Sequence, residues 1–221
     1  MPSMQIELMP YERRAIEAIE KAPGLDRELV VGFARSLSSL ADMFERAIKG
    51  NGELRAGHVV TVGLINHTHH LLAGGVQTLR DGNGPVWSAC VRGLIETFGA
   101  CVLISERPGT APNYLKPIKP GKLRAAAERA KPGLLKDIHR LDQVVHPASG
   151  AIYAGFKTIG AGAKSVHVRF GLNPPDRSEG TEGVIVLANL AALLVEKLED
   201  LLSRPEVLSA GKAIMVRTAN P

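Results

Sequence analysis

Apolar residues recur at steps of three and four along most of the chain, which is the periodicity of amphipathic helices. The segment from Pro10 to Ala22 predicts a short first helix. Asp26 is a suitable N-cap for a second helix, whose apolar positions continue to Ile48. Residues 50–52, Gly-Asn-Gly, tolerate positive φ and are expected to end it.

A third helix is predicted from about Ala56 to Arg80, followed by a compact turn over residues 81–84. Pro85 suits the first turn of a fourth helix. This fourth helix, from Val86 to Ile104, is apolar over most of its surface, so it is expected at the centre of a bundle. Its main apolar stripe comprises Trp87, Val91, Leu94, Phe98 and Cys101.

The second half of the chain has a less regular pattern. Four prolines between residues 108 and 120 predict an extended crossing loop. A helix is expected from Lys122 to Ala130, and Pro132 begins another helical stretch that stops at Pro147. Apolar residues then alternate with polar or small ones over about residues 151–172, which predicts a β-hairpin. A last long helix is predicted from Thr181 to Ser203.

These elements predict a mainly all-α fold, a bundle of five to seven helices with a small β-hairpin excursion before the last long helix. Aromatic residues are only 4% of the 221-residue chain, so the core rests on aliphatic side chains, which favours helix-on-helix packing. We expect residues 1–52 to form an N-terminal helical arm packed on a bundle of residues 53–221.

Cysteine usage and hydropathy indicate a cytoplasmic protein. The two cysteines, Cys90 and Cys101, lie three turns apart on one apolar helix, so we expect no disulfide between them. Residues 1–8 lack the features of a signal peptide, and no apolar stretch reaches about 18 residues without a charge, so no membrane span is expected.

The common nucleotide-binding, zinc and serine-hydrolase motifs are absent, so we expect no cofactor. His67 and His70 have a spacing that occurs in metal sites, but no carboxylate lies in register beside them. His69 falls on the apolar stripe of the third helix and is better explained as a hydrogen-bonded core histidine. No metal site is therefore predicted.

The net charge of +5 is concentrated in one segment. Between Lys116 and Arg140, eight basic residues face two acidic ones, a balance of 8 − 2 = +6. The basic residues are Lys116, Lys119, Lys122, Arg124, Arg129, Lys131, Lys136 and Arg140. This segment is either a solvated helical face or a binding site for phosphates.

The fourth helix carries unexpected polar residues. Ser88, Arg92 and Glu96 are spaced by four, so they share one stripe of the most apolar helix. Arg92 and Glu96 are predicted to pair with each other, either as a buried ion pair that clamps neighbouring helices or as contacts for an anion or substrate.

A second polar group lies where the helical stretch stops at Pro147. Arg140 and His146 are six residues apart, and Asp142, one turn before His146, is placed to orient its imidazole. A histidine that moves a proton and an arginine that stabilises a charged phosphate are sufficient for metal-free RNA cleavage. The alternative is a helix C-terminus at which His146 favours the dipole and Asp142 pairs with it.

These residues resemble the HEPN superfamily, whose RNase members carry an arginine, four to six intervening residues and a histidine on a late helix. The chain also looks like a group of uncharacterised bacterial HEPN-like proteins with an Arg-x-x-x-Glu helix and a Val-His-Pro motif. The matching residues are 92–96 and 145–147, and the resemblance covers roughly residues 56–203. RNase members commonly have a polar residue directly after the arginine, where this chain has Leu141.

The resemblance implies an RNA-binding or RNA-cleaving protein of a bacterial stress or defence system, acting as a homodimer. Arg140 and His146 are then the catalytic pair, oriented by Asp142. Arg92, Glu96, Ser88 and His69 support the pocket, and the basic residues Lys122, Arg124, Arg129 and Lys136 hold the phosphate backbone. The alternative is a non-enzymatic helical module for a protein partner or small ligand.

Overall fold

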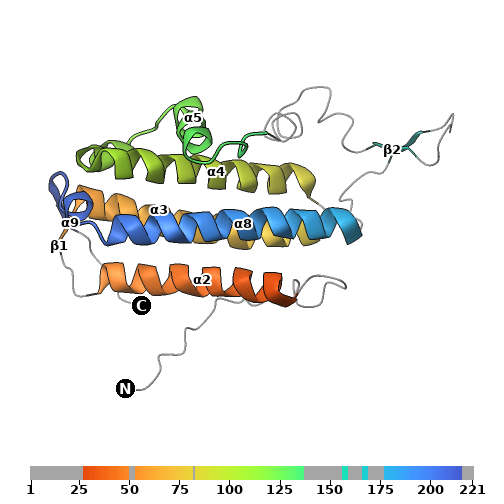
Figure 1. Ribbon diagram of the computed structural model, residues 1–221, viewed down its shortest axis with the longest axis horizontal. Coiled ribbons are helices and arrows are strands. Elements are labelled where there is room, and N and C mark those ends of the chain that lie inside the picture. The colour runs from red at the N-terminus through yellow and green to blue at the C-terminus, as the bar shows by residue number, and fades with distance from the viewer. Residues whose placement is uncertain are drawn as a thin grey trace, which may run out of the picture.

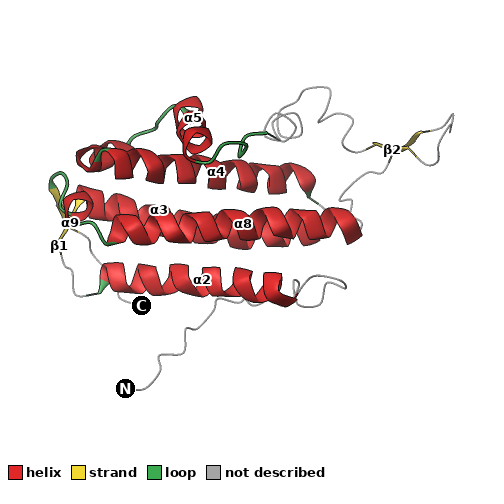
Figure 2. Ribbon diagram, in the orientation of Figure 1, coloured by secondary structure: helices red, strands yellow, loops and turns green. Residues whose placement is uncertain are grey.

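The computed structural model describes residues 27–49, 53–81, 83–136, 156–158, 166–168 and 177–215. These residues are mostly helical, as the sequence predicts. Four long helices run side by side: α2 (Arg27–Ile48), α3 (Ala56–Arg80), α4 (Gly84–Glu106) and α8 (Arg177–Leu202) (Figures 1 and 2). The predicted first helix, residues 10–22, lies outside the described residues.

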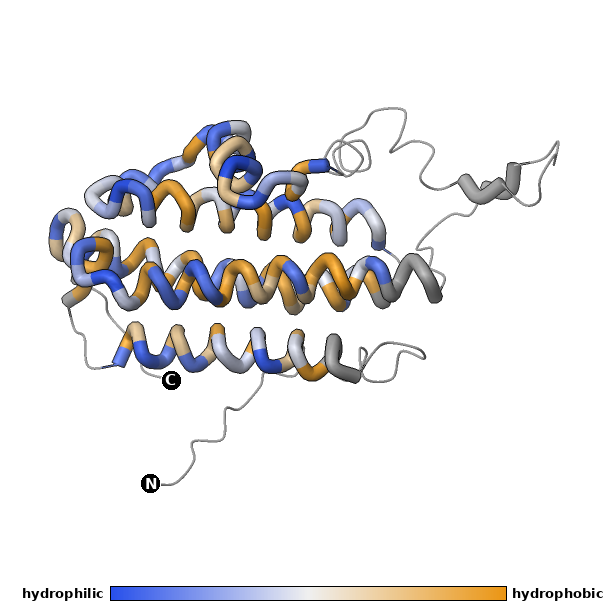
Figure 3. The backbone as a smooth tube through the Cα atoms, in the orientation of Figure 1, coloured by the Kyte–Doolittle hydropathy of each residue, from blue (hydrophilic) through white to orange (hydrophobic). Residues whose placement is uncertain are grey.

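The helices stack with α3 and α8 in the middle, α2 on one side and α4 on the other (Figure 1). Six apolar residues spaced by three or four along the last long helix are buried: Val184, Leu187, Ala191, Leu194, Leu198 and Leu201. The fourth helix also has its predicted stripe in the core, although Trp87 is only partly buried. Figure 3 shows the apolar positions recurring along these helices.

The buried face of α2 is rotated slightly from the predicted one. Phe33, Leu37 and Leu40 are buried as expected. At the C-terminal end, Met43 and Ala47 replace the predicted Phe44 and Ile48 in the core. The helical period of 3.6 allows either set, and only contact with α3 and α8 decides between them.

Helix boundaries follow local chemistry. Helix α3 spans the predicted residues, and α4 begins after Asn83, whose side chain accepts a hydrogen bond from the amide of Val86. Pro85 lies in the first turn, as predicted. Helix α8 begins at Arg177, before the predicted Thr181. Cys90 and Cys101 are free and buried, and burial raises the pKa of the Cys101 thiol to about 12.

The proline-rich segment corrects one prediction. Residues Pro108–Leu115 form a 3-10 helix, η1, instead of an extended loop. Its tighter turns accommodate Pro112, because fewer backbone amides need an acceptor in a short helix. Helix α5 (Pro120–Ala130) then begins with a proline in its first turn, two residues before the predicted start.

Helix α5 lies across the outer side of α4 (Figure 1). The contact depends on Gly99, because a Cβ there would collide with the carbonyl oxygen of Leu123. Ala126 and Ala127 of α5 are buried at the same contact. Small residues on both helices therefore let the two backbones approach closely.

The structure of residues 131–136 also differs from the prediction. A helix was predicted to restart at Pro132, but the chain makes hydrogen-bonded turns there, with Gly133 at a φ of 89°. The Glu128 carboxylate accepts hydrogen bonds from the amides of Gly133 and Leu135. These bonds lower the pKa of Glu128 and hold the turn against the end of α5.

Two small antiparallel pairs complete the described chain. The predicted hairpin is confirmed: β2 (Phe156–Thr158) pairs with β3 (Val166–Val168), with Phe156 opposite Val168. The second pair was not predicted. Strand β1 (Glu53–Arg55) pairs with β4 (Ala213–Met215), next to the short helix α9 (Pro205–Leu208).

We predict that Gly99→Ala destabilises the protein by roughly 1–3 kcal/mol, because the new methyl group forces α5 away from α4. Gly32→Ala is the matched control, since nothing lies within 4 Å of a Cβ there, and it should stabilise α2 by about 0.5–1 kcal/mol. Urea unfolding measures both. Equal changes in the two variants would contradict the close contact.

Candidate functional site

An ion-pair network joins α4 to α5. The Arg92 Nε donates to Glu96 Oε1 at 3.0 Å within one turn of α4, and Arg124 of α5 lies 3.8 Å from the same oxygen. All three side chains are about one fifth exposed. The predicted pairing of Arg92 with Glu96 is therefore present, and Glu96 also holds a second helix.

Two further predicted residues, Ser88 and His69, lie on α4 and α3. Ser88 is buried at the start of α4. His69 on α3 is half-buried, and its ring meets that of His70 edge-on, with 6.0 Å between centroids. Burial and the neighbouring His70 lower the pKa of His67. Within the described residues no three His, Cys, Asp or Glu side chains are arranged to hold a metal ion.

The basic segment divides into two kinds of residue. Both arginines of α5 pair with carboxylates of α4: Arg124 with Glu96, and Arg129 with Glu106 at 2.7 Å. The lysines are different, because they are exposed and no described carboxylate pairs with them. They are Lys116, Lys119, Lys122, Lys131 and Lys136. Arginines thus fix the segment to the bundle, and lysines form a positive surface on it.

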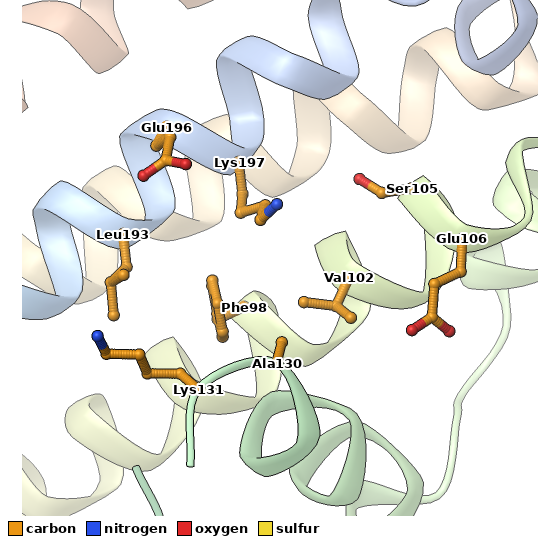
Figure 4. A pocket seen from close by; sticks show the side chains of 9 residues that line it. All are labelled: Phe98, Val102, Ser105, Glu106, Ala130, Lys131, Leu193, Glu196 and Lys197. Atoms are coloured by element: carbon orange, nitrogen blue, oxygen red, sulfur yellow. The ribbon is translucent and has the colours of Figure 1, made fainter. Parts of the chain in front are cut away.

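A pocket of about 380 Å³ lies between α4, the end of α5 and α8 (Figure 4). Phe98, Val102 and Leu193 supply apolar surface, and Lys131 and Lys197 bring two ammonium groups to it. The sequence analysis did not identify Lys197 as a candidate site residue. The available signal was a lysine between the buried residues Leu194 and Leu198 of α8. The carboxylates of Glu106 and Glu196 also line this pocket, so its lining is balanced in charge.

A second cavity is an open groove of about 470 Å³. It is lined by α3, α4, the end of η1, the loop that follows η1 and the start of α5. Its polar groups include Glu96, His67, Tyr114 and Lys116. Aliphatic side chains make most of its wall: Val59, Val60, Leu64, Leu115, Ile118 and Leu123. Both cavities therefore border the segment that carries the lysines.

Arg140, Asp142 and His146 lie outside the described residues. Their predicted roles stay predictions. Of the remaining predicted residues, Arg92, Glu96 and Arg124 are brought together, whereas Lys122, Arg129 and Lys136 are spread over the outer surface of α5 and the following turn.

Among the described helices, α4 is long and apolar enough to cross a bilayer. However, 67% of its most apolar stretch is buried in the bundle, and core helices of bundles commonly meet the same criterion. The surrounding helices α3, α5 and α8 all pack on it.

Comparison of the chain with protein-family profiles, with curated proteins and with solved structures gives no significant match. The chemistry of the described surface therefore carries the functional argument.

The ion pairs of Glu96 and Glu106 differ in burial, so breaking each is predicted to lower the free energy of unfolding by a different amount. Glu96→Gln should destabilise the protein by about 1.5–3 kcal/mol, because it removes a carboxylate that two arginines, each about one fifth exposed, contact. Glu106→Gln is the control and should cost about 1 kcal/mol or less, since its pair is 57% and 45% exposed. Thermal or urea unfolding compares them, and a larger loss for Glu106→Gln would refute the assignment.

Proposed function

We propose that this chain is an HEPN-like RNA-binding protein that holds the phosphate backbone on its basic segment. The observation that carries the proposal is the set of exposed lysines from the end of η1 to the turn after α5, which no described carboxylate neutralises. RNA supplies the regularly spaced negative charges that such a surface attracts. The Arg-x-x-x-Glu motif on a helix of a helical bundle agrees with the resemblance.

The division between arginines and lysines supports this assignment. A solvated helical face of mixed charge is expected to pair its lysines with nearby carboxylates. Here the acidic residues close to α5 are already engaged: Glu96 and Glu106 by arginines, and Glu128 by backbone amides. The lysine charge is left facing outward, where it attracts a polyanion.

The proposal extends to metal-independent cleavage of the bound RNA, with the protein cytoplasmic and homodimeric. His146 would move the proton of the 2′-hydroxyl or the leaving group, Arg140 would stabilise the negative charge that develops on phosphorus, and Asp142 would orient His146. In the RNases of the HEPN superfamily two copies of the motif face each other, which is the basis for the homodimer.

The first prediction concerns two lysines beside the start of α5. Lys119→Gln with Lys122→Gln should weaken binding of single-stranded RNA and reduce the slope of log affinity against log salt by about 1.4, or about 0.7 for each lost phosphate contact. Fluorescence anisotropy over a salt series measures the slope.

The matched control for that pair is Lys49→Gln with Lys212→Gln, which removes the same charge from exposed positions outside the basic segment. It should leave the slope close to that of wild type. Equal slopes for both double variants, or an affinity that does not respond to salt, would remove the basic segment as an RNA-binding site.

The second prediction concerns catalysis. Wild-type protein in the presence of a chelator should cleave single-stranded RNA, and His146→Ala should lose at least about a hundredfold of that activity, because general acid–base catalysis contributes this much. Circular dichroism verifies that the variant is folded. Absence of cleavage by pure wild-type protein, with RNA binding retained, would leave RNA binding and exclude the nuclease.

A second candidate function is a non-enzymatic helical module that binds a partner protein or small ligand. The pairing of Glu96 with both Arg92 and Arg124 favours it, because these charges serve to join α5 to α4. In this alternative neither double lysine variant changes RNA affinity, and His146→Ala leaves every measured property of the folded protein unchanged.

A further inference from the structure

The groove between α3 and α4 contains a glycine that the packing does not require. Gly63 lies in the interior of α3, where glycine is about 1 kcal/mol less favourable than alanine. A Cβ at this position meets nothing within 4 Å, and its φ is not positive. Gly57 on the same helix is different, because a Cβ there would collide with the carbonyl oxygen of Val207. Gly63 therefore has a steric consequence only for the groove.

The position of Gly63 places the missing side chain within that groove. Val59, Gly63 and His67 are spaced by four, so they form one line along α3, and all three line the groove. Any larger residue at 63 would occupy space that is now open. The volume of about 470 Å³ is within the range of small-molecule sites.

The charged residues of the groove determine which ligand charge it favours. Glu96 is the carboxylate of the wall, and it is already paired with Arg92 and Arg124. Lys116 is exposed where the groove opens beside Leu115, itself 51% exposed, and no described carboxylate pairs with this lysine. The ion pairs thus leave the lysine as the charge available to a ligand, which favours an anion.

We propose that this groove binds a small amphipathic anion, with an aliphatic body against Val60, Leu64 and Leu123 and an acidic group at Lys116. The aliphatic wall matches a hydrocarbon body, since burial of apolar surface supplies the driving force. His67 and Tyr114 offer hydrogen-bonding groups along the same wall. The site shares Lys116 with the basic segment but does not include Lys119 or Lys122, and it stands whether or not the chain binds RNA.

Decanoate is the probe, and isothermal titration calorimetry on the full chain is the measurement. Wild-type protein should bind one decanoate, and decylammonium, which has the same chain length and the opposite charge, should bind at least about tenfold more weakly. Gly63→Leu should weaken decanoate binding at least about tenfold, because its side chain fills the groove. Lys116→Gln should weaken it about two- to fivefold.

The control for Gly63→Leu is Gly32→Leu, since Gly32 is another helical glycine whose Cβ would meet nothing, and it lies on α2 away from the groove. Both variants gain helix propensity, so both should remain folded. Gly32→Leu and the double variant of Lys119 and Lys122 should bind decanoate as wild type does.

Three results would overturn the proposal: no decanoate binding by wild type, equal binding by the two leucine variants, or equal binding of decanoate and decylammonium. None of them bears on the salt dependence of RNA binding. Loss of that salt dependence would likewise leave the groove intact, so the two proposals fail separately.

Discussion

Much of the described structure depends on how a carboxylate is accommodated in the most apolar helix. Glu96 lies on α4, which packs against α3, α5 and α8, and an ionised carboxylate in such a place is costly without partners. Arg92 supplies one partner from the same helix and Arg124 supplies another from α5. The ion pairs that compensate the Glu96 carboxylate therefore also fix the position of α5, and with it the segment that carries the lysines.

The small residues at the same contact have a complementary role. Ion pairs at one fifth exposure are sensitive to distance, and the backbones must come close before the arginine reaches α4. Gly99, Ala126 and Ala127 permit this approach. Shape and charge are thus coupled at one contact, whereas the outer pair of Arg129 with Glu106 is exposed and contributes less.

The sequence predicts the long helices well because their signals are local and repeated. The stripe of α8 and the boundaries of α3 follow from spacing alone. Pairings that depend on distant segments leave little local signal. Strands β1 and β4 have three residues each, and their partners are far apart in the sequence, so the pair was missed. The pairing of Arg92 with Glu96 was predictable from one helix. The participation of Arg124, and the presence of Lys197 and Lys131 in one pocket, depend on how the helices pack.

The pairing of β1 with β4 also affects when the start of α3 can complete its hydrogen bonds during synthesis. The amides of Ala56 and Gly57, at the unsatisfied first turn of α3, donate to the carbonyls of Lys212 and Ala210. Those acceptors follow α8 in the chain, so they emerge from the ribosome after α2, α3, α4 and α8. The first amides of α3 therefore lack these acceptors while α2, α3 and α4 are already synthesised. The contact also closes a long loop, from the start of α3 to the segment after α9, and closing a long loop is slow. The first turn of α3 is therefore expected to gain these two hydrogen bonds only after α8 has been synthesised, later than the turns that α3 forms within itself.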